Sequence, residues 1–178
     1  MLATLPMYDW PEIRHATDAW WQGLARHAGL TTPLDRLTDY VEAWRRPDLL
    51  FSQTCGYPFT HEFRGKLNYV ATPYYAADGC EGPLYCSLIF AREHAPVEAF
   101  YGGKAAINGW DSMSGMLALK AVVAPHATSG RFFGKTLVSG SHRQSLAMVQ
   151  AGTADLCAVD SVCVELARRH VPSLLEGL

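Results

Sequence analysis

Apolar positions along the chain follow two patterns, stripes typical of helices and short runs typical of strands. Ile13, Ala16, Trp20 and Leu24 recur at helical spacing, which predicts a helix from Pro11 to a stop at Gly29. A second stripe predicts a helix that opens like a capping box at residues 32–35 and runs to Trp44. Further helices are predicted at residues 109–121, 141–152 and 161–170. Strands are predicted at residues 49–54, 67–72, 84–91, 104–108, 135–140 and 155–160.

The order of these elements predicts an α/β protein. Strands and helices alternate through most of the chain, which is typical of a parallel or mixed sheet covered by helices. An irregular connector near residues 91–103 predicts two α/β lobes, residues 1–91 and residues 92–178. Ligands of such folds bind at the carboxyl ends of strands, so polar residues there are the candidates for a site.

Composition narrows the function classes. The chain has 178 residues, 49% of them apolar, which is enough for one sizeable core or two small lobes. A formal net charge of −2 gives no reason to expect a nucleic-acid partner. No apolar stretch reaches the length of about 18 residues that a membrane-spanning helix needs. The first residues carry no signal-peptide features, so we expect either a cytoplasmic protein or an exported one whose leader has been removed.

Cysteine and histidine spacing predicts neither a metal site nor a cofactor. The five cysteines form no C-x-x-C pair, and the seven histidines form no H-x-x-x-H pair. Cys80 and Cys86 flank five residues and would form a disulfide only in an exported protein, so free thiols are the favoured expectation.

The segment "DSMSG" crowds small residues at a predicted helix start. Asp111 or Ser112 is accounted for by a role as the helix cap. Ser114 and Gly115 add a hydroxyl and an open approach to the backbone, which a cap does not need. The free N–H groups of a helix start bind anions, so both a plain cap and an anion site stay open here.

A second and a third helix start carry polar groups of the same kind. Ser141 and Gln144 form a capping box, which places His142 in the first turn, either facing solvent or donating to an anion. Asp160 closes a strand and is either a cap or a ligand group that suits a proton or a cationic substituent. In the first half, Tyr8 and Tyr57 follow predicted strands and are either loop aromatics or a cover for a small ligand.

These segments together resemble a known family. "QTCGYPF", "DSMSG" and "GRFFGKTLVSGSHRQSLAMVQAGTADLCAVDS" are similar to the phosphate, phosphite and phosphonate substrate-binding proteins of ABC transporters. The resemblance implies a two-lobed type 2 periplasmic-binding-protein fold that holds a small oxyanion between its lobes. The implied ligand-binding residues are Tyr8, Tyr57, Ser112, Ser114, Gly115, His142 and Asp160, with no catalytic residue.

The resemblance also implies partners. These are a small anionic solute and a transporter permease, with the protein in the periplasm or at the membrane exterior. Met113 stands where the family often has a hydroxyl, and the usual C-terminal return to the first lobe is absent. We therefore expect either that a second copy of the chain completes the first lobe or that the lobe exposes a sheet edge.

Two other functions stay open at this point. A cytoplasmic enzyme of the same fold would use Cys55 or His142 as its catalytic group. A cytoplasmic ligand sensor would keep the same binding residues and dock to a partner.

Overall fold

A computed structural model describes residues 1–178 and divides the chain into two compact units. The smaller unit comprises Met1–Cys55 and Glu62–Asn68, and the larger unit comprises Gly56–His61 and Tyr69–Leu178. The strand at Ser87–Phe90 pairs within the larger unit. The lobe limits at residues 91 and 92 stay a prediction, and the two units are described separately below.

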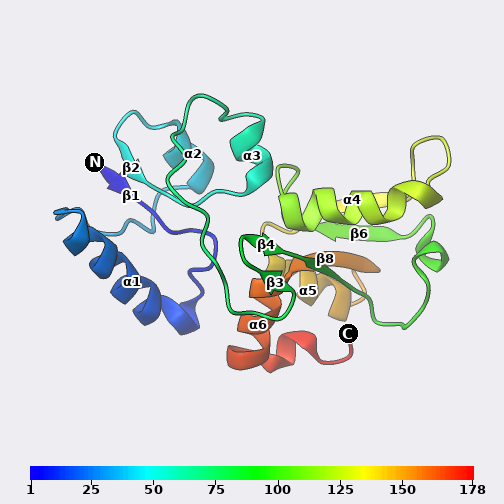
Figure 1. Cartoon of the computed structure of the whole chain (residues 1–178). Helices are drawn as coiled ribbons and strands as arrows, with labels where there is room; N and C mark the ends of the chain where they lie inside the picture. Colours follow the sequence, from blue (N-terminus) through cyan, green and yellow to red (C-terminus); the bar gives the residue numbers. More distant parts are fainter. The chain divides into compact units, whose positions relative to one another are not determined.

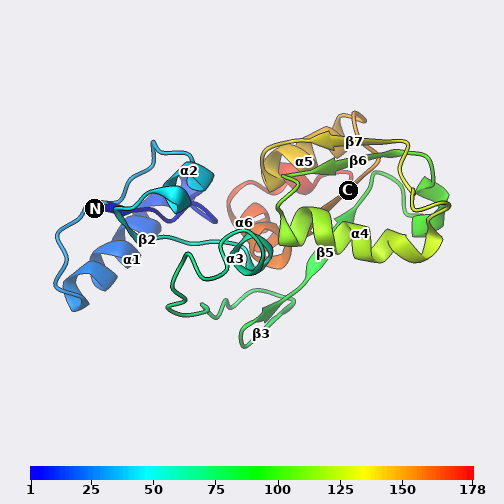
Figure 2. The same ribbon diagram turned by 90° about the horizontal axis from the view of Figure 1, so that it is seen from above.

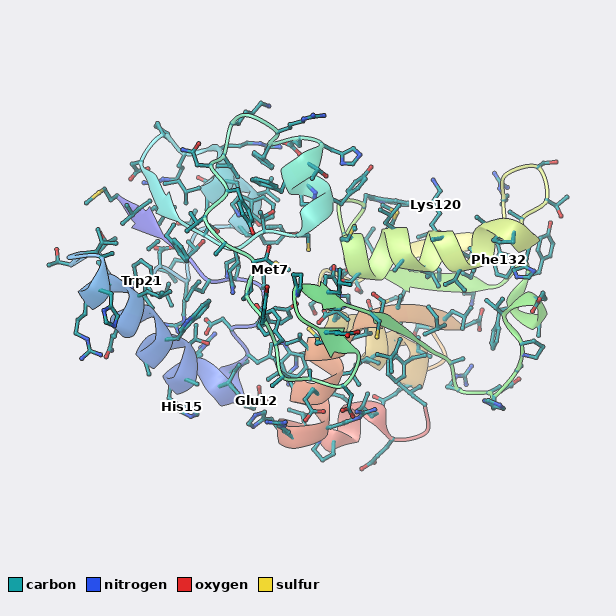
Figure 3. The ribbon with its side chains drawn as sticks, viewed as in Figure 1. Met7, Glu12, His15, Trp21, Lys120 and Phe132 are labelled. Atoms are coloured by element: carbon teal, nitrogen blue, oxygen red, sulfur yellow. The ribbon has the colours of Figure 1, made fainter.

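The smaller unit is built around a short parallel strand pair. Strand β1 (Leu2–Ala3) pairs with β2 (Leu49–Phe51), and helices α1 (Arg14–His27) and α2 (Tyr40–Arg45) come between them in the chain. Trp21, labelled on α1 in Figure 3, is buried against the ring of Phe51, and its Nε1 donates to the carbonyl of Thr32 at 3.0 Å. The helix is confirmed, but its predicted apolar stripe is wrong: Ala16 and Trp20 are exposed, and the buried face carries Trp21 and Ala25, with only Leu24 of the predicted positions packed against the core. The predicted start at Pro11 is a 3-10 turn, Pro11–Ile13.

The predicted start of the second helix is wrong. Leu34 instead forms a parallel bridge with Ala3, and the amide of Asp35 donates to the carbonyl of Ala3 at 2.8 Å. Asp39 is the actual cap, because its carboxylate accepts from the amides of Val41 and Glu42. Pairing with β1 thus competes successfully with a helix over residues 33–38.

The strand predicted at residues 67–72 is also wrong. Its β-prone residues Tyr69 and Val70 are exposed, and no strand pairs with the segment. A strand needs a neighbour for its backbone groups, and sequence pattern alone does not supply one.

The larger unit contains a four-stranded mixed sheet. Its order is β5 (Ser87–Phe90), β8 (Leu156–Asp160), β6 (Lys104–Ile107) and β7 (Lys135–Val138). Strands β8, β6 and β7 are parallel, and β5 is antiparallel to β8. Helix α3 (Gly56–Thr60) and a small hairpin of β3 (Cys80–Glu81) and β4 (Leu84–Tyr85) complete its ordered segments before the sheet. The expectation of an α/β fold with mixed sheets is confirmed.

Helices cover both faces of this sheet. A π-helical turn (Met113–Leu117) continues into α4 (Ala118–Val123) on one face, whereas α5 (His142–Gln150) and α6 (Ser161–His170) lie on the other (Figures 1 and 2). Leu119 and Val123 of α4 pack with Ala105, Ile107 and Ala158 of the sheet. Lys120 points away from that face, into solvent (Figure 3). The rest of the unit is short 3-10 turns at Val97–Phe100, Ala124–His126 and Pro172–Leu175.

No helix of the structure combines the length and the apolar character that a membrane span requires.

Candidate functional site

Three strand-to-helix junctions of the larger unit lie at one edge of its sheet. Strands β6, β7 and β8 are parallel, so their carboxyl ends share an edge, and each leads into a helix. The residues that cap these helices are Ser112, one of the two candidates from the sequence, Ser141, and Asp160, for which a cap was one of two expectations. Such an edge, where helix N-termini come together, is the usual ligand site of an open α/β sheet.

The first junction combines a cap with an irregular turn. Ser112 Oγ accepts from the amide of Gly115 at 2.9 Å, which leaves the serine hydroxyl hydrogen free to donate elsewhere. The observed N-cap is therefore Ser112 and not Asp111. The helix opens as a π turn, in which the amide of Leu117 donates to the carbonyl of Ser112. Turns of this kind occur mostly as single insertions and often at functional sites.

His142 links the other two junctions to the first. Its Nε2 lies 2.8 Å from Ser114 Oγ and 3.1 Å from Asp160 Oδ2. The other carboxylate oxygen, Asp160 Oδ1, accepts from the amide of Cys163 at 2.9 Å. All three polar side chains are nearly buried, with exposed fractions of 4% for Ser114, 10% for the His142 side chain and 3% for the Asp160 side chain.

The charge of Asp160 determines which ring nitrogen of His142 carries a hydrogen. Burial opposes ionisation of Asp160, but the hydrogen bonds from His142 and from the Cys163 amide outweigh it and lower the pKa of the carboxyl. The ionised carboxylate only accepts hydrogen bonds, so Nε2 of His142 carries a proton. The hydroxyl hydrogen of Ser114 is then free to donate to a bound anion.

Each carboxylate oxygen of Asp160 therefore already has a partner inside the protein. One oxygen caps α6 and the other holds His142. A cationic substituent on a ligand would have to compete with both contacts. This argues against the role of selecting amine-bearing ligands that a free carboxylate would suit.

The same geometry differs from a serine-hydrolase triad. In a triad, the serine contacts one ring nitrogen of the histidine and the carboxylate contacts the other. Here Ser114 and Asp160 both contact Nε2, and Nδ1 is buried without a hydrogen-bond partner. The arrangement suits donation to an anion better than activation of the serine as a nucleophile.

Gly115 is required by close packing. A Cβ at this position would lie 1.9 Å from Asn108 Oδ1 and 3.2 Å from His142 Cε1. Any side chain would push the asparagine and the histidine apart. The glycine thus serves to seat these two side chains as well as to open the backbone.

Sequence reasoning missed two residues near this edge. Asn108 directly follows β6, and the place just after a strand was a usable signal. Tyr75, in the irregular segment before β3, lies close enough to Asp160 for the charge of the carboxylate to act on its phenol. Burial, followed by that charge, raises the pKa of Tyr75 to about 12, so it stays a neutral phenol.

The two tyrosines expected to cover the ligand belong to different units. Tyr57 is half-buried on α3 of the larger unit, where its ring stacks on His61 with centroids 4.2 Å apart. Tyr8 belongs to the smaller unit. Close to it, the amide of Met7, labelled in Figure 3, donates to the side chain of Gln53. Their roles toward a ligand stay predictions.

The cysteines and acidic groups form no metal centre. The structure holds no group of three or more His, Cys, Asp or Glu side chains that could bind a metal ion. All five cysteines are free thiols, and Cys80 Sγ lies 3.3 Å from Ser161 Oγ.

Comparison with known proteins gives one family over nearly the whole chain. Residues 2–178 match the family model described as the periplasmic substrate-binding protein of a phosphonate ABC transporter. No curated protein matches the chain.

Solved structures share the fold at low sequence identity. PhnD1 from Prochlorococcus marinus, solved in complex with methylphosphonate, aligns at a TM-score of 0.69 with 16% identity, over 97% of this chain and 68% of that one. XAC2383 from Xanthomonas citri, solved with chloride, aligns at 0.58 with 19% identity, over 99% of this chain and 70% of that one. The ATP-bound form of XAC2383 aligns at 0.55 with 19% identity, over 97% of this chain and 68% of that one.

Proposed function

This chain belongs to the family of periplasmic substrate-binding proteins of phosphonate ABC transporters, and from that premise we propose that it captures a small phosphonate- or phosphate-type oxyanion at the Ser112, Ser114, Gly115, His142 and Asp160 edge of its larger unit. Solute capture for transport is the function of the family. The identity of the solute and the residues that hold it are the proposal.

The contact of His142 with Ser114 is the observation that carries this proposal. It holds the Ser114 oxygen against the imidazole N–H and leaves the hydroxyl hydrogen free to donate at an edge where three helices begin. Helix N-termini carry partial positive charge and free N–H groups, and both favour an oxyanion. PhnD1, which shares the fold, is a methylphosphonate complex, which supports the same ligand class.

The ligand we propose carries no amine. Both carboxylate oxygens of Asp160 already accept hydrogen bonds, and Met113 presents a thioether rather than a hydroxyl at the helix start. We therefore expect methylphosphonate to bind at least as well as aminoethylphosphonate.

The remaining parts of the function follow from the family. We propose delivery of the solute to a transporter permease in the periplasm, without chemical conversion of the solute. Because Ser114 and Asp160 share one nitrogen of His142, the site lacks the relay that would activate the serine. Association of two copies of the chain stays a proposal as well, and native mass spectrometry tests it.

A thermal-shift panel tests the proposed ligand and site. Methylphosphonate, phosphate, phosphite, sulfate and aminoethylphosphonate would be added to the wild type and to His142→Ala. A ligand that binds only the folded protein raises its melting temperature by mass action. We expect methylphosphonate or phosphate to raise the melting temperature of the wild type, and His142→Ala to lose most of that rise.

His15→Ala is the matched control, because His15 is exposed on α1 of the smaller unit and lies outside the candidate site (Figure 3). It should keep the full rise in melting temperature. An equal rise in His142→Ala and wild type would refute the site, and no rise with any oxyanion would refute the ligand class.

A further inference from the structure

Two buried polar atoms of the site edge have no hydrogen-bond partner. They are Asn108 Oδ1 and His142 Nδ1. Buried polar atoms are almost always paired, so an unpaired atom next to a functional group calls for an explanation. Two such atoms on neighbouring side chains call for a common one.

The two side chains face the same glycine. A Cβ built on Gly115 would touch Asn108 Oδ1 at 1.9 Å and the Cε1 of His142 at 3.2 Å. Cε1 lies between Nδ1 and Nε2 in the imidazole ring, and Nε2 already contacts Ser114 and Asp160, so Nδ1 is the ring nitrogen left for the asparagine. A side chain at residue 115 would fill the space that brings the two together.

The backbone holds Asn108 in this place. Asn108 directly follows β6, and its carbonyl accepts from the amide of Gly140 at 3.1 Å. Gly140 leads through the cap Ser141 to His142 itself. The asparagine and the histidine are therefore fixed to each other through the junctions of β6 and β7.

The chemistry of the ring leaves one atom free to change its protonation. Asp160 at the end of β8 accepts from Nε2, so that nitrogen keeps its proton. The other groups close by are the Ser114 hydroxyl on Nε2, Arg143, which follows on α5, and Tyr75 and Cys163, which lie beside Asp160. Only Nδ1 can gain a proton, and a buried Nδ1–H needs an acceptor.

We infer that Asn108 is a positioning residue for His142, and that its Oδ1 accepts the Nδ1–H of the histidine when an oxyanion binds beside Ser114. The histidine then meets the anion as an imidazolium, with a proton on each nitrogen and an acceptor for each proton. Binding of the anion therefore takes up one proton. This inference deepens the proposed function and rests on it for the identity of the anion. The proposed hydrogen bond between Asn108 and His142 does not depend on that identity.

Long-range proton–nitrogen NMR of the imidazole ring tests the inference directly. The wild type, Asn108→Leu and Asn108→Asp would be measured with methylphosphonate, together with calorimetric affinities in two buffers of different ionisation enthalpy. We expect a protected Nδ1–H and proton uptake in the wild type and in Asn108→Asp, which keeps an acceptor oxygen. Asn108→Leu should lose both and bind about tenfold more weakly, since a charged donor is left unpaired.

Asn68→Leu is the matched control, because Asn68 is exposed and lies in the smaller unit. It should behave as the wild type. Melting curves of each variant without ligand separate a folding defect from a binding defect. If Nδ1 carries no proton in the wild-type complex, or if Asn108→Leu keeps the Nδ1–H and the affinity, the inference is wrong.

The same spectra without ligand, recorded at about pH 5 where imidazoles are charged, test the Asn108–His142 hydrogen bond separately from oxyanion binding. A protected Nδ1–H in the wild type that is lost in Asn108→Leu supports the contact even if no oxyanion binds. Its absence in the wild type overturns the contact whether or not an oxyanion binds.

Discussion

At the scale of single residues, the candidate site depends on the absence of a side chain at Gly115. The space where a Gly115 side chain would stand is occupied by Asn108 Oδ1, with His142 Cε1 beside it. In contrast, a Cβ at Gly23 of α1 would meet nothing within 4 Å. The same substitution should therefore have opposite effects at the two glycines.

We expect Gly115→Ala to lower the free energy of unfolding by roughly 1–3 kcal/mol, because the added methyl group must displace packed side chains. It should also weaken binding of the oxyanion. Gly23→Ala should raise the free energy of unfolding by about 0.5–1 kcal/mol, since alanine loses less backbone freedom in a helix. Urea denaturation measures both, and a neutral or stabilising Gly115→Ala would contradict the packing argument.

At the scale of elements, α6 shows how one carboxylate serves both a helix and a site. Asp160 Oδ1 caps the helix at the Cys163 amide, and Oδ2 holds the ring of His142. Burial opposes the charge, but these contacts leave the pKa of Asp160 below its ordinary value. A carboxyl whose pKa is lowered by folding stabilises the protein above its ordinary pKa and loses that contribution as the pH falls.

Asp160→Asn should therefore destabilise the protein most at neutral pH. We expect a loss of roughly 1–3 kcal/mol in the free energy of unfolding at pH 7, typical of a lost charge-assisted hydrogen bond. The difference from the wild type should shrink below about pH 4, where the unfolded carboxyl also becomes protonated. Denaturant unfolding at several pH values measures it, and a difference independent of pH would contradict the prediction.

Asp48→Asn is the control for a surface carboxylate. The hydrogen bond from Arg46, opposed by slight desolvation and helped by the N-terminus, lowers the pKa of Asp48 to about 2, but the pair is exposed. Salt screens such pairs, so this substitution should have a smaller effect that fades at high ionic strength.

At the scale of the whole molecule, the five cysteine thiols show which parts of the fold are protected from solvent. Cys86 is exposed, Cys55 and Cys80 are intermediate, and Cys157 and Cys163 are buried. Cys157 lies in the central strand β8, where burial raises the pKa of its thiol to about 12. The thiolate is the reactive form, so burial and the raised pKa both protect Cys157.

Alkylation with iodoacetamide at pH 8 should therefore label Cys86 in the native protein and leave Cys157 unlabelled. Peptide mass spectrometry identifies the modified residues, and labelling in denaturant gives the full extent for comparison. Equal labelling of Cys157 and Cys86 in the native protein would show that the sheet opens readily.

The sequence alone determined the elements whose signals are local. The capping residues Ser112, Ser141 and Asp160 are all among the caps that the sequence offered, because a cap requires only a side chain within three residues of the amides it accepts from. The sequence did not choose between Asp111 and Ser112. The alternation of strand and helix in the second half, and the mixed sheet that follows from it, were also readable for this reason. The family resemblance rested on the same segments.

Tertiary structure decided what depends on partners distant in sequence. Leu34 bridges to Ala3 of β1 where a helix was predicted, and residues 67–72 have no strand to pair with. The contacts of His142 with Ser114 and Asp160 join residues 28 and 18 positions apart, and the seat of Asn108 appears only through the missing side chain of Gly115. Hydrogen-bond partners and packing distances across a sheet edge are set by the fold as a whole, so no local pattern in the sequence could specify them.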